Sequence, residues 1–193
     1  MRDSQKHRVY QSEWATKRAE DDLGSLEAVT AWVTKITRQS WFKRRWPGHT
    51  AVKRGCHWVP RWSISRGRAG SYAHGSCFSL VLPPWAWNKM VVLHEMAHGL
   101  SPTQLGFGKG ESASHGRAFC RVFLELVRFA VGREVEVLLK GNFKRFRVKY
   151  VRVGQYRPSP QTIAAGIEAL RNLRTAAAKR QADRTSQEAQ EGV

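Results

Sequence analysis

Residues 88–100 read NKMVVLHEMAHGL, an apolar stretch that contains the pattern His-Glu-X-X-His at residues 94–98. Apolar side chains recur on every side of this stretch, which predicts a helix that is buried on most of its faces. The expected helix begins at Trp85 or Asn88 and ends at Leu100, before a Ser-Pro pair that stops it.

The spacing of the motif has a physical reason. Four residues turn an ideal helix by about 400°, so His94 and His98 point in nearly the same direction, one turn apart. Both imidazoles can then reach one zinc ion, and Glu95 lies beside them as the general base for a water molecule that the zinc activates. The alternative is that His94 and His98 are core histidines satisfied by hydrogen bonds.

A catalytic zinc usually has three protein ligands, so one more is expected elsewhere in the chain. The extended motif with a third histidine close by is absent, and His115 is the best candidate. We expect a helix capped by Ser112 or Ser114, with His115 in its first turn on the same face as Phe119 and Val122, and so directed inward. Competing ligands are Glu111 and Glu125.

Other side chains in the chain could take part in chemistry, with weaker signals. The possible transition-state donors, which the sequence does not rank, are Tyr72, His74, Arg117 and Tyr150. A second, structural zinc site could use the ligand-type residues Cys56, His57, His74 and Cys77. The alternative for this second group is a β-rich region that buries its cysteines, which is the more usual situation.

The chain is strongly basic, with 33 Lys and Arg against 15 Asp and Glu, a net charge of +18. Segments 41–70 and 141–160 contain no carboxylate and supply 14 of these charges. We expect them to lie on one side of the fold or to flank the cleft, where they could bind DNA or RNA. The candidate contacts, which interleave cations with an aromatic ring, are Lys43, Arg44, Arg45, Trp46 and Arg61. The alternatives are that the charge serves solubility and that the tryptophans enter the core.

The remaining pattern predicts an α+β fold. Helices are expected over 3–22 and from Leu26 to Ile36, and short strands, mostly antiparallel, over 50–53, 57–65 and 77–82. After the motif, helices are expected up to Ala130 and over 133–140, with a strand over 149–153. Residues 1–155 then form the domain, and residues 156–193 form a C-terminal helix and flexible tail.

The length of 193 residues fits one ordinary domain, and three cysteines are too few for a disulfide framework. No apolar run has the length of a membrane span, and the opening residues do not resemble a signal peptide. We therefore expect a soluble cytoplasmic protein without a membrane partner.

Several stretches resemble a known family. They are Leu80-Val81-Leu82-Pro83, Trp85-Ala86, Val91 to His98, His115-Gly116 with Phe119, the opening Arg2-Asp3-Ser4-Gln5 with Val9-Tyr10, and Trp46-Pro47-Gly48. Together they resemble the HExxH metallohydrolases of actinobacteria and their phages, over residues 1–155. More distantly, they are similar to SprT-like zinc metalloproteases, some of which cut proteins attached to DNA. The resemblance implies a zincin-like fold, zinc ligation by His94, His98 and His115, and Glu95 as the base.

The sequence is therefore compatible with three functions. The first is a zinc metallohydrolase that cleaves a protein or peptide substrate. The second is a basic nucleic-acid-binding protein whose zinc site is structural or degenerate, and the third is a protease directed to proteins on DNA or RNA. Glu95 favours the first over the second, because a purely structural site has no use for a carboxylate beside the metal that does not bind it.

Overall fold

The computed structural model of the chain describes residues 5–54, 56–76, 78–101 and 115–151. It confirms the α+β class, with helices and small sheets in one unit, Met1–Tyr156. The α-helices are α1 (Lys6–Trp14), α2 (Leu26–Thr37), α3 (Ser40–Arg45), α4 (Lys89–Leu100), α5 (Arg117–Ala130) and α6 (Arg133–Arg145). The strands are β1 (Val52–Arg54), β2 (His57–Val59), β3 (Ser63–Arg66), β4 (His74–Gly75) and β5 (Ser79–Leu82), and three short 3₁₀ turns are η1 (Ala19–Asp21), η2 (Pro47–His49) and η3 (Pro84–Ala86).

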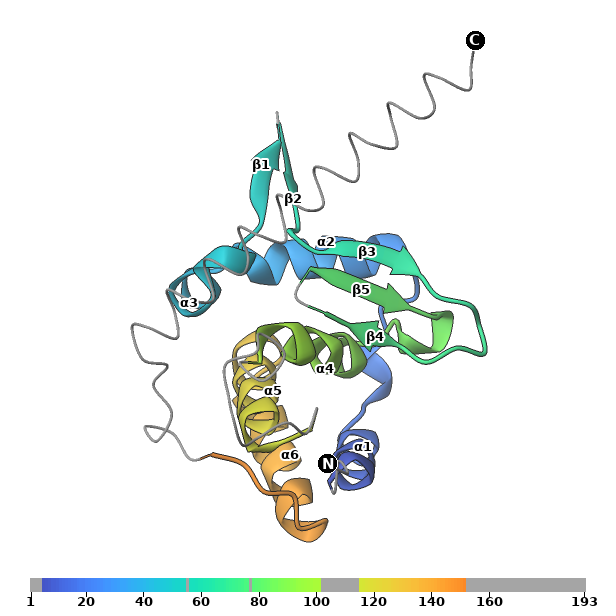
Figure 1. Cartoon of the computed structure of the whole chain (residues 1–193), viewed down its shortest axis with the longest axis vertical. Helices are drawn as coiled ribbons and strands as arrows, with labels where there is room; N and C mark the ends of the chain where they lie inside the picture. Colours follow the sequence, from blue (N-terminus) through green and yellow to red (C-terminus); the bar gives the residue numbers. More distant parts are fainter. Residues whose placement is uncertain (1–4, 55, 77, 102–114, 152–193) are drawn as a thin grey trace, which may run out of the picture. The chain divides into compact units, whose positions relative to one another are not determined.

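The strands form two separate sheets. β1 and β2 pair as an antiparallel hairpin that projects from the rest of the unit (Figure 1). The other sheet has the order β3-β5-β4, in which β3 is parallel to β5 and β4 is antiparallel to it. The parallel pair differs from the mostly antiparallel sheet that the sequence predicts, and the single expected strand over 57–65 is divided between two sheets.

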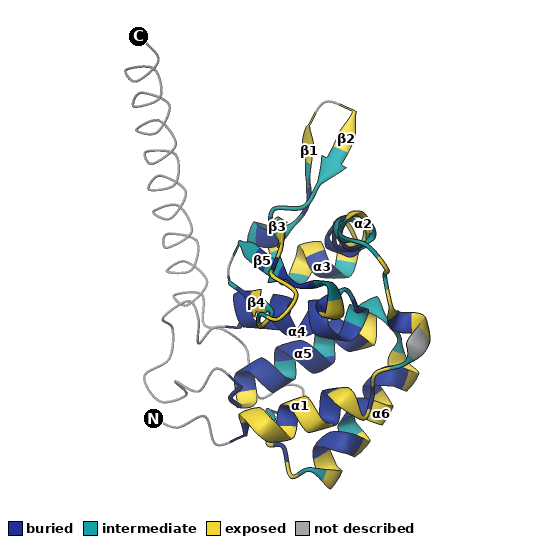
Figure 2. Ribbon diagram, turned by 90° about the vertical axis from the view of Figure 1, so that its right-hand side faces the viewer, coloured by how far each residue is buried: buried dark blue, intermediate teal, exposed yellow. Residues whose placement is uncertain are grey.

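The helix that carries the motif lies at the centre of the unit. Figure 1 shows α4 between the β3-β5-β4 sheet on one side and α5 on the other. Every residue from Met90 to Leu100 is buried, which Figure 2 shows as a continuous dark helix. The structure therefore confirms the prediction that this helix is buried on most of its faces.

The N-terminal part is less helical than predicted. The expected helix over 3–22 is confirmed only in α1, and the chain then turns through η1 before α2 begins. The start of α2 follows the predicted cap, because the side chain of Ser25 accepts a hydrogen bond from the backbone N–H of Ala28 at 3.1 Å.

The C-terminal elements also differ from the predictions. α5 begins at Arg117 with Gly116 as its N-cap, so His115 precedes the helix instead of occupying its first turn. α6 continues to Arg145, beyond the predicted end at residue 140. Residues 149–151 form no strand, and the remainder of the predicted strand, together with segment 156–193, lies outside the described residues.

No helix in the described part of the chain combines the length and the apolar character that crossing a membrane requires.

Candidate metal centre

Helix α4 positions two of the three histidines. The side chain of Asn88 caps the helix by accepting a hydrogen bond from the N–H of Met90 at 3.0 Å. From this fixed start, His94 and His98 follow one turn apart on the same face, and their ring centroids are 5.0 Å apart. Both rings are buried.

The third histidine comes from the residue before α5. The backbone carbonyl of His115 accepts a hydrogen bond from Nε2 of Gln5 at 2.7 Å and a weaker one from Sγ of Cys120 at 3.6 Å. The same Gln5 amide also donates to the carbonyl of Lys149 at 3.1 Å and accepts from its N–H at 2.9 Å. A single buried amide thus joins the N-terminus and the segment after α6 to the backbone at His115.

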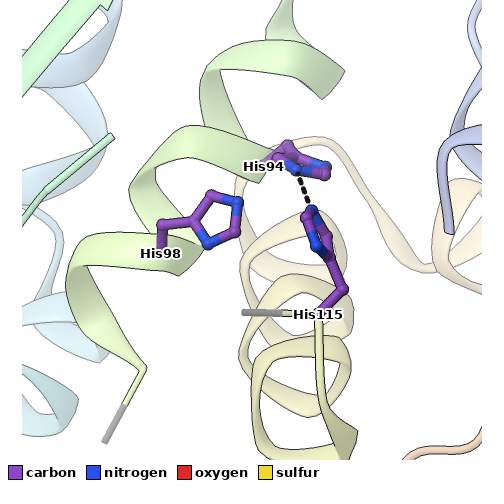
Figure 3. Close-up of side chains that lie close together, drawn as sticks. All are labelled: His94, His98 and His115. Atoms are coloured by element: carbon purple, nitrogen blue, oxygen red, sulfur yellow. Dashed lines mark hydrogen bonds between the residues drawn. The ribbon is translucent and has the colours of Figure 1, made fainter. Parts of the chain in front are cut away.

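The three imidazoles converge (Figure 3). Nε2 of His94 lies 3.1 Å from Nε2 of His115, and the ligand atoms of His94, His98 and His115 all lie within 4.8 Å of one another. All three side chains are buried, and the ring of Phe119 packs against that of His98 with centroids 4.5 Å apart. Neutral imidazoles that meet in an apolar surrounding are a donor set for a transition metal, so this group could hold a metal ion.

A carboxylate that the sequence did not indicate contacts this group. Oε2 of Glu13, on α1, lies 2.7 Å from Nδ1 of His94, and both side chains are buried. Burial by itself lowers the pKa of His94, but the negative charge of Glu13 and its contact with the ring outweigh burial and raise that pKa above its ordinary value. Because Nδ1 faces Glu13, the Nε2 atom of His94 is the one directed at His115.

Glu95 is buried beside the histidines and against strand β4. Burial raises the pKa of its carboxyl group, although the nearby His94 and a hydrogen bond from the backbone N–H of Gly75 act in the opposite direction. The strand and the helix are in very close contact here. A Cβ atom added at Gly75 would lie 2.0 Å from the backbone oxygen of Glu95, so only glycine fits this position.

The competing ligands do not join the group in the described structure. Glu125 forms an ion pair with Arg45 at 3.0 Å and lies 3.9 Å from Arg121. It is therefore neutralised by cations and lies apart from the three imidazoles. Glu111 falls in the part of the chain that the structure does not describe.

The possible transition-state donors are separated by the fold. Tyr72 lines the same cavity as His94 and Glu95, and His74 on β4 is close enough to Glu95 to affect its pKa. Tyr150 instead packs on Phe143, with ring centroids 5.9 Å apart, and so belongs to the core beside α6. Arg117 is exposed at the start of α5.

The residues considered for a second zinc site are dispersed. Cys56 and His57 are exposed in the β1–β2 hairpin, whereas His74 belongs to the other sheet. Cys77 lies outside the described residues, so the described structure brings no second ligand group together from this set.

The described parts of the two acid-free segments lie in different regions of the unit. Segment 41–70 contains α3 and the β1–β2 hairpin, whereas the described part of segment 141–160 continues from the end of α6, and Figures 1 and 2 show these regions at opposite ends of the unit. The described parts of the two segments therefore do not lie on one side of the fold, and residues 152–160 lie outside the described residues. The alternative, that the segments flank the cleft, remains a prediction. The candidate nucleic-acid-binding residues have different surroundings. Lys43 and Arg44 are exposed, Arg45 pairs with Glu125, and Trp46 packs on Phe42, whereas Arg61 is half-buried.

No protein-family model matches this chain, and no curated protein or solved structure is significantly similar to it. The geometry of the site is therefore the basis for the functional conclusion.

Proposed function

We propose that this chain is a zinc-dependent metallohydrolase that cleaves peptide bonds, with His94, His98 and His115 as ligands and Glu95 as general base. The observation that carries the proposal is the convergence of three buried imidazoles beside a buried carboxylate that is not needed as a ligand. The resemblance to HExxH metallohydrolases and SprT-like metalloproteases, and with it a zincin-like fold, belongs to the same proposal.

The spacing of the donor atoms suits zinc. Two imidazole nitrogens bound to tetrahedral zinc at ~2.0–2.1 Å lie about 3.3 Å from each other. The separation of 3.1 Å between the Nε2 atoms of His94 and His115 is close to this value. The ligand atom of His98 lies within 4.8 Å of the other two. Three imidazoles leave a fourth position for water or substrate, as in catalytic zinc sites.

A carboxylate–histidine contact supports the same assignment. Histidines that bind metals usually donate their second ring N–H to a carboxylate, a carbonyl or water, which fixes the tautomer and the ring orientation. Glu13 occupies this position at Nδ1 of His94, at 2.7 Å. In the proposed site, Glu13 is a positioning residue that leaves Nε2 of His94 free of its proton and aimed at the metal.

Each remaining residue then has a defined task. Bound zinc would supply a Lewis acid that lowers the pKa of a water molecule and polarises the scissile carbonyl. Glu95 would accept the proton from that water at its carboxylate and later deliver it to the leaving amine. Tyr72 and His74 are the described candidates for a donor to the oxyanion, because Tyr72 lines the same cavity as Glu95 and the charge of His74 affects the pKa of Glu95.

The test is hydrolysis of fluorescein-labelled casein by the zinc-loaded wild type and by Glu95→Gln, with Glu27→Gln as a matched control on the exposed surface of α2. Glu95→Gln should retain zinc and lose roughly 10²–10⁴-fold in rate, the usual contribution of general base catalysis. The control should keep the wild-type rate. An unchanged rate in Glu95→Gln, or no hydrolysis by the zinc-loaded wild type, would contradict the proposal.

A second candidate function is nucleic-acid binding by the basic surface at α3 and the hairpin. The observation that favours it is a pair of cations over an indole, with Arg38 at 4.6 Å and Lys43 at 5.7 Å from the ring centroid of Trp58. Cations beside an aromatic ring suit phosphate contacts together with base stacking. This surface is separate from the metal centre, so binding there is compatible with either a peptidase or a protein whose metal is structural.

A further inference from the structure

A cavity of about 210 Å³ adjoins the metal centre on the side of His94 and Glu95. Its floor is α4, through Val91, His94 and Glu95, and its walls come from α1 on one side and from Tyr72, Ala73 and Trp85 on the other. Small-molecule sites usually measure roughly 300–1,000 Å³, so this cavity is sized for a single side chain of a larger ligand.

The walls of the cavity are aromatic and exposed. Tyr10, Trp14, Tyr72 and Trp85 line it, and their exposed fractions are 41%, 77%, 92% and 51%. Seven large apolar side chains are exposed among the described residues, and four of them line this cavity. Exposed apolar surface that is concentrated at one concave place marks a binding site, whereas scattered apolar residues need no explanation.

One face of α1 supplies four of the eleven residues that line the cavity. Lys6, Tyr10, Glu13 and Trp14 follow one another at helical spacing, so they share the face that meets the cavity. Glu13 is the member that contacts His94, at 2.7 Å. The helix that supports the metal ligand is therefore the helix that forms the cavity wall.

The opposite wall is held in place by the fold. The indole N–H of Trp85 donates to the carbonyl of Ser71 at 3.1 Å, which fixes the ring of Trp85 next to the segment that leads into β4. Trp85 is thus preorganised in spite of its exposure, so its part of the wall needs no rearrangement to accept a ligand.

Two cations stand at the rim. Lys6 and Lys17 are exposed, and each ammonium lies over an aromatic ring, at 5.9 Å from the centroid of Tyr10 and 5.6 Å from that of Trp14. The acidic lining residues Glu13 and Glu95 are buried next to His94, so the charge that the rim presents to a ligand is positive. A carboxylate beside the bound side chain would complement it.

We propose that this cavity is the substrate-selecting site of the enzyme, and that it binds an aromatic or large aliphatic side chain of a polypeptide next to an acidic residue. The role of the cavity as a substrate site rests on the proposed peptidase function. Binding of the peptide side chain depends only on the cavity. The substrate is then an extended peptide with an acidic–aromatic pair, recognised beside the bond that Glu95 helps to hydrolyse.

The experiment uses the zinc-loaded Glu95→Gln protein, which should bind peptides without cleaving them. Three fluorescein-labelled octapeptides are compared by anisotropy, with central pairs Glu-Phe, Glu-Ala and Lys-Phe. Apolar pockets discriminate by roughly 10- to 200-fold for each methylene, and because this cavity is partly open we expect Glu-Phe to bind at least about 10-fold more tightly than Glu-Ala. Lys-Phe should bind severalfold more weakly than Glu-Phe at low ionic strength.

Two substitutions test whether the walls of the cavity cause the preference for Phe over Ala. Trp85→Ala and Trp14→Ala, each made in the Glu95→Gln protein, should reduce the preference for Phe over Ala to less than about threefold, because each removes a wall. Leu138→Ala, at an exposed apolar residue on α6 that does not line the cavity, is the matched control and should keep the preference. Trp14 and Trp85 are exposed, so neither substitution removes a residue of the core.

The outcomes separate the two proposals. No measurable peptide binding, equal affinity for Glu-Phe and Glu-Ala, or a preference that survives both tryptophan substitutions would overturn the assignment of the cavity. Selective binding together with a wild type that hydrolyses none of the three peptides would support the cavity as a peptide-binding site while contradicting the proposed peptidase function.

Discussion

Removal of the Glu13 carboxylate should weaken metal binding without removing a metal ligand. Oε2 of Glu13 lies 2.7 Å from Nδ1 of His94, with both groups buried, so no water molecule would readily replace the carboxylate. Loss of such a partner typically costs 10- to 100-fold in metal affinity, which corresponds to about 1.4–2.7 kcal/mol. Glu13→Gln keeps a neutral acceptor and should lose about 10-fold, whereas Glu13→Ala removes the acceptor and should approach 100-fold.

The assay is competition for zinc between the protein and a fluorescent zinc indicator at fixed, near-neutral pH. Glu27→Ala, at an exposed carboxylate on α2, is the control and should bind zinc as the wild type does. Thermal unfolding of the metal-free proteins shows whether each variant is folded at the assay temperature. A folded Glu13→Ala variant with a zinc Kd within twofold of the wild type would refute the positioning role.

Three further predictions concern the surroundings of the site and the basic surface. Gly75→Ala should destabilise the fold by about 1–3 kcal/mol in denaturant titrations, because its Cβ would lie 2.0 Å from the backbone oxygen of Glu95. The control Gly141→Ala, whose Cβ would meet nothing within 4 Å, should not destabilise the fold. A Gly75→Ala variant as stable as the wild type would contradict the prediction. The apparent affinity for zinc should fall on acidification. The pKa of His94 in the metal-free protein is raised above its ordinary value, so protons compete with the metal for this ring. An equal zinc affinity at pH 7.5 and pH 5.5 would contradict the assignment. The double substitution Lys43→Gln/Arg44→Gln should make the slope of log DNA affinity against log salt concentration shallower by about 0.7–0.9 for each lost phosphate contact. An unchanged slope would show that these two side chains do not contact phosphates.

The sequence predicts the centre of the site because its geometry is local. His94, Glu95 and His98 belong to one helix, and the spacing along a helix determines which side chains share a face. The apolar residues around the motif predict the burial of α4, and the structure confirms that burial. These features require no knowledge of how distant segments pack.

The contribution of α1 could not be predicted in the same way. Glu13 lies 81 positions before His94, and nothing in its local sequence distinguishes it from a solvent-exposed glutamate. Its contact exists only because α1 packs beside the centre, where Gln5 also holds the backbone at His115. Identification of such a residue from sequence would require the tertiary arrangement first.

Strand β4 shows a second reason why parts of the fold could not be predicted from the sequence. It contains only two residues, His74 and Gly75, which is too short for any alternating pattern. The tight contact between Gly75 and the backbone of Glu95 gives the strand its place, and that contact is made with a residue 20 positions later in the chain. The parallel pairing of β3 with β5 is equally non-local, since residue alternation alone does not specify which strand is the neighbour.

The metal content of the purified protein shows whether the three histidines form a zinc site. Inductively coupled plasma mass spectrometry of the wild type and of His94→Ala, His98→Ala and His115→Ala, after equilibration with a small excess of zinc and gel filtration, measures the number of ions retained per chain. We expect about one zinc per wild-type chain and a large loss of zinc in each variant, because each substitution removes one of three ligands. A wild type that retains no zinc, or a His94→Ala variant that retains a full equivalent, would contradict it.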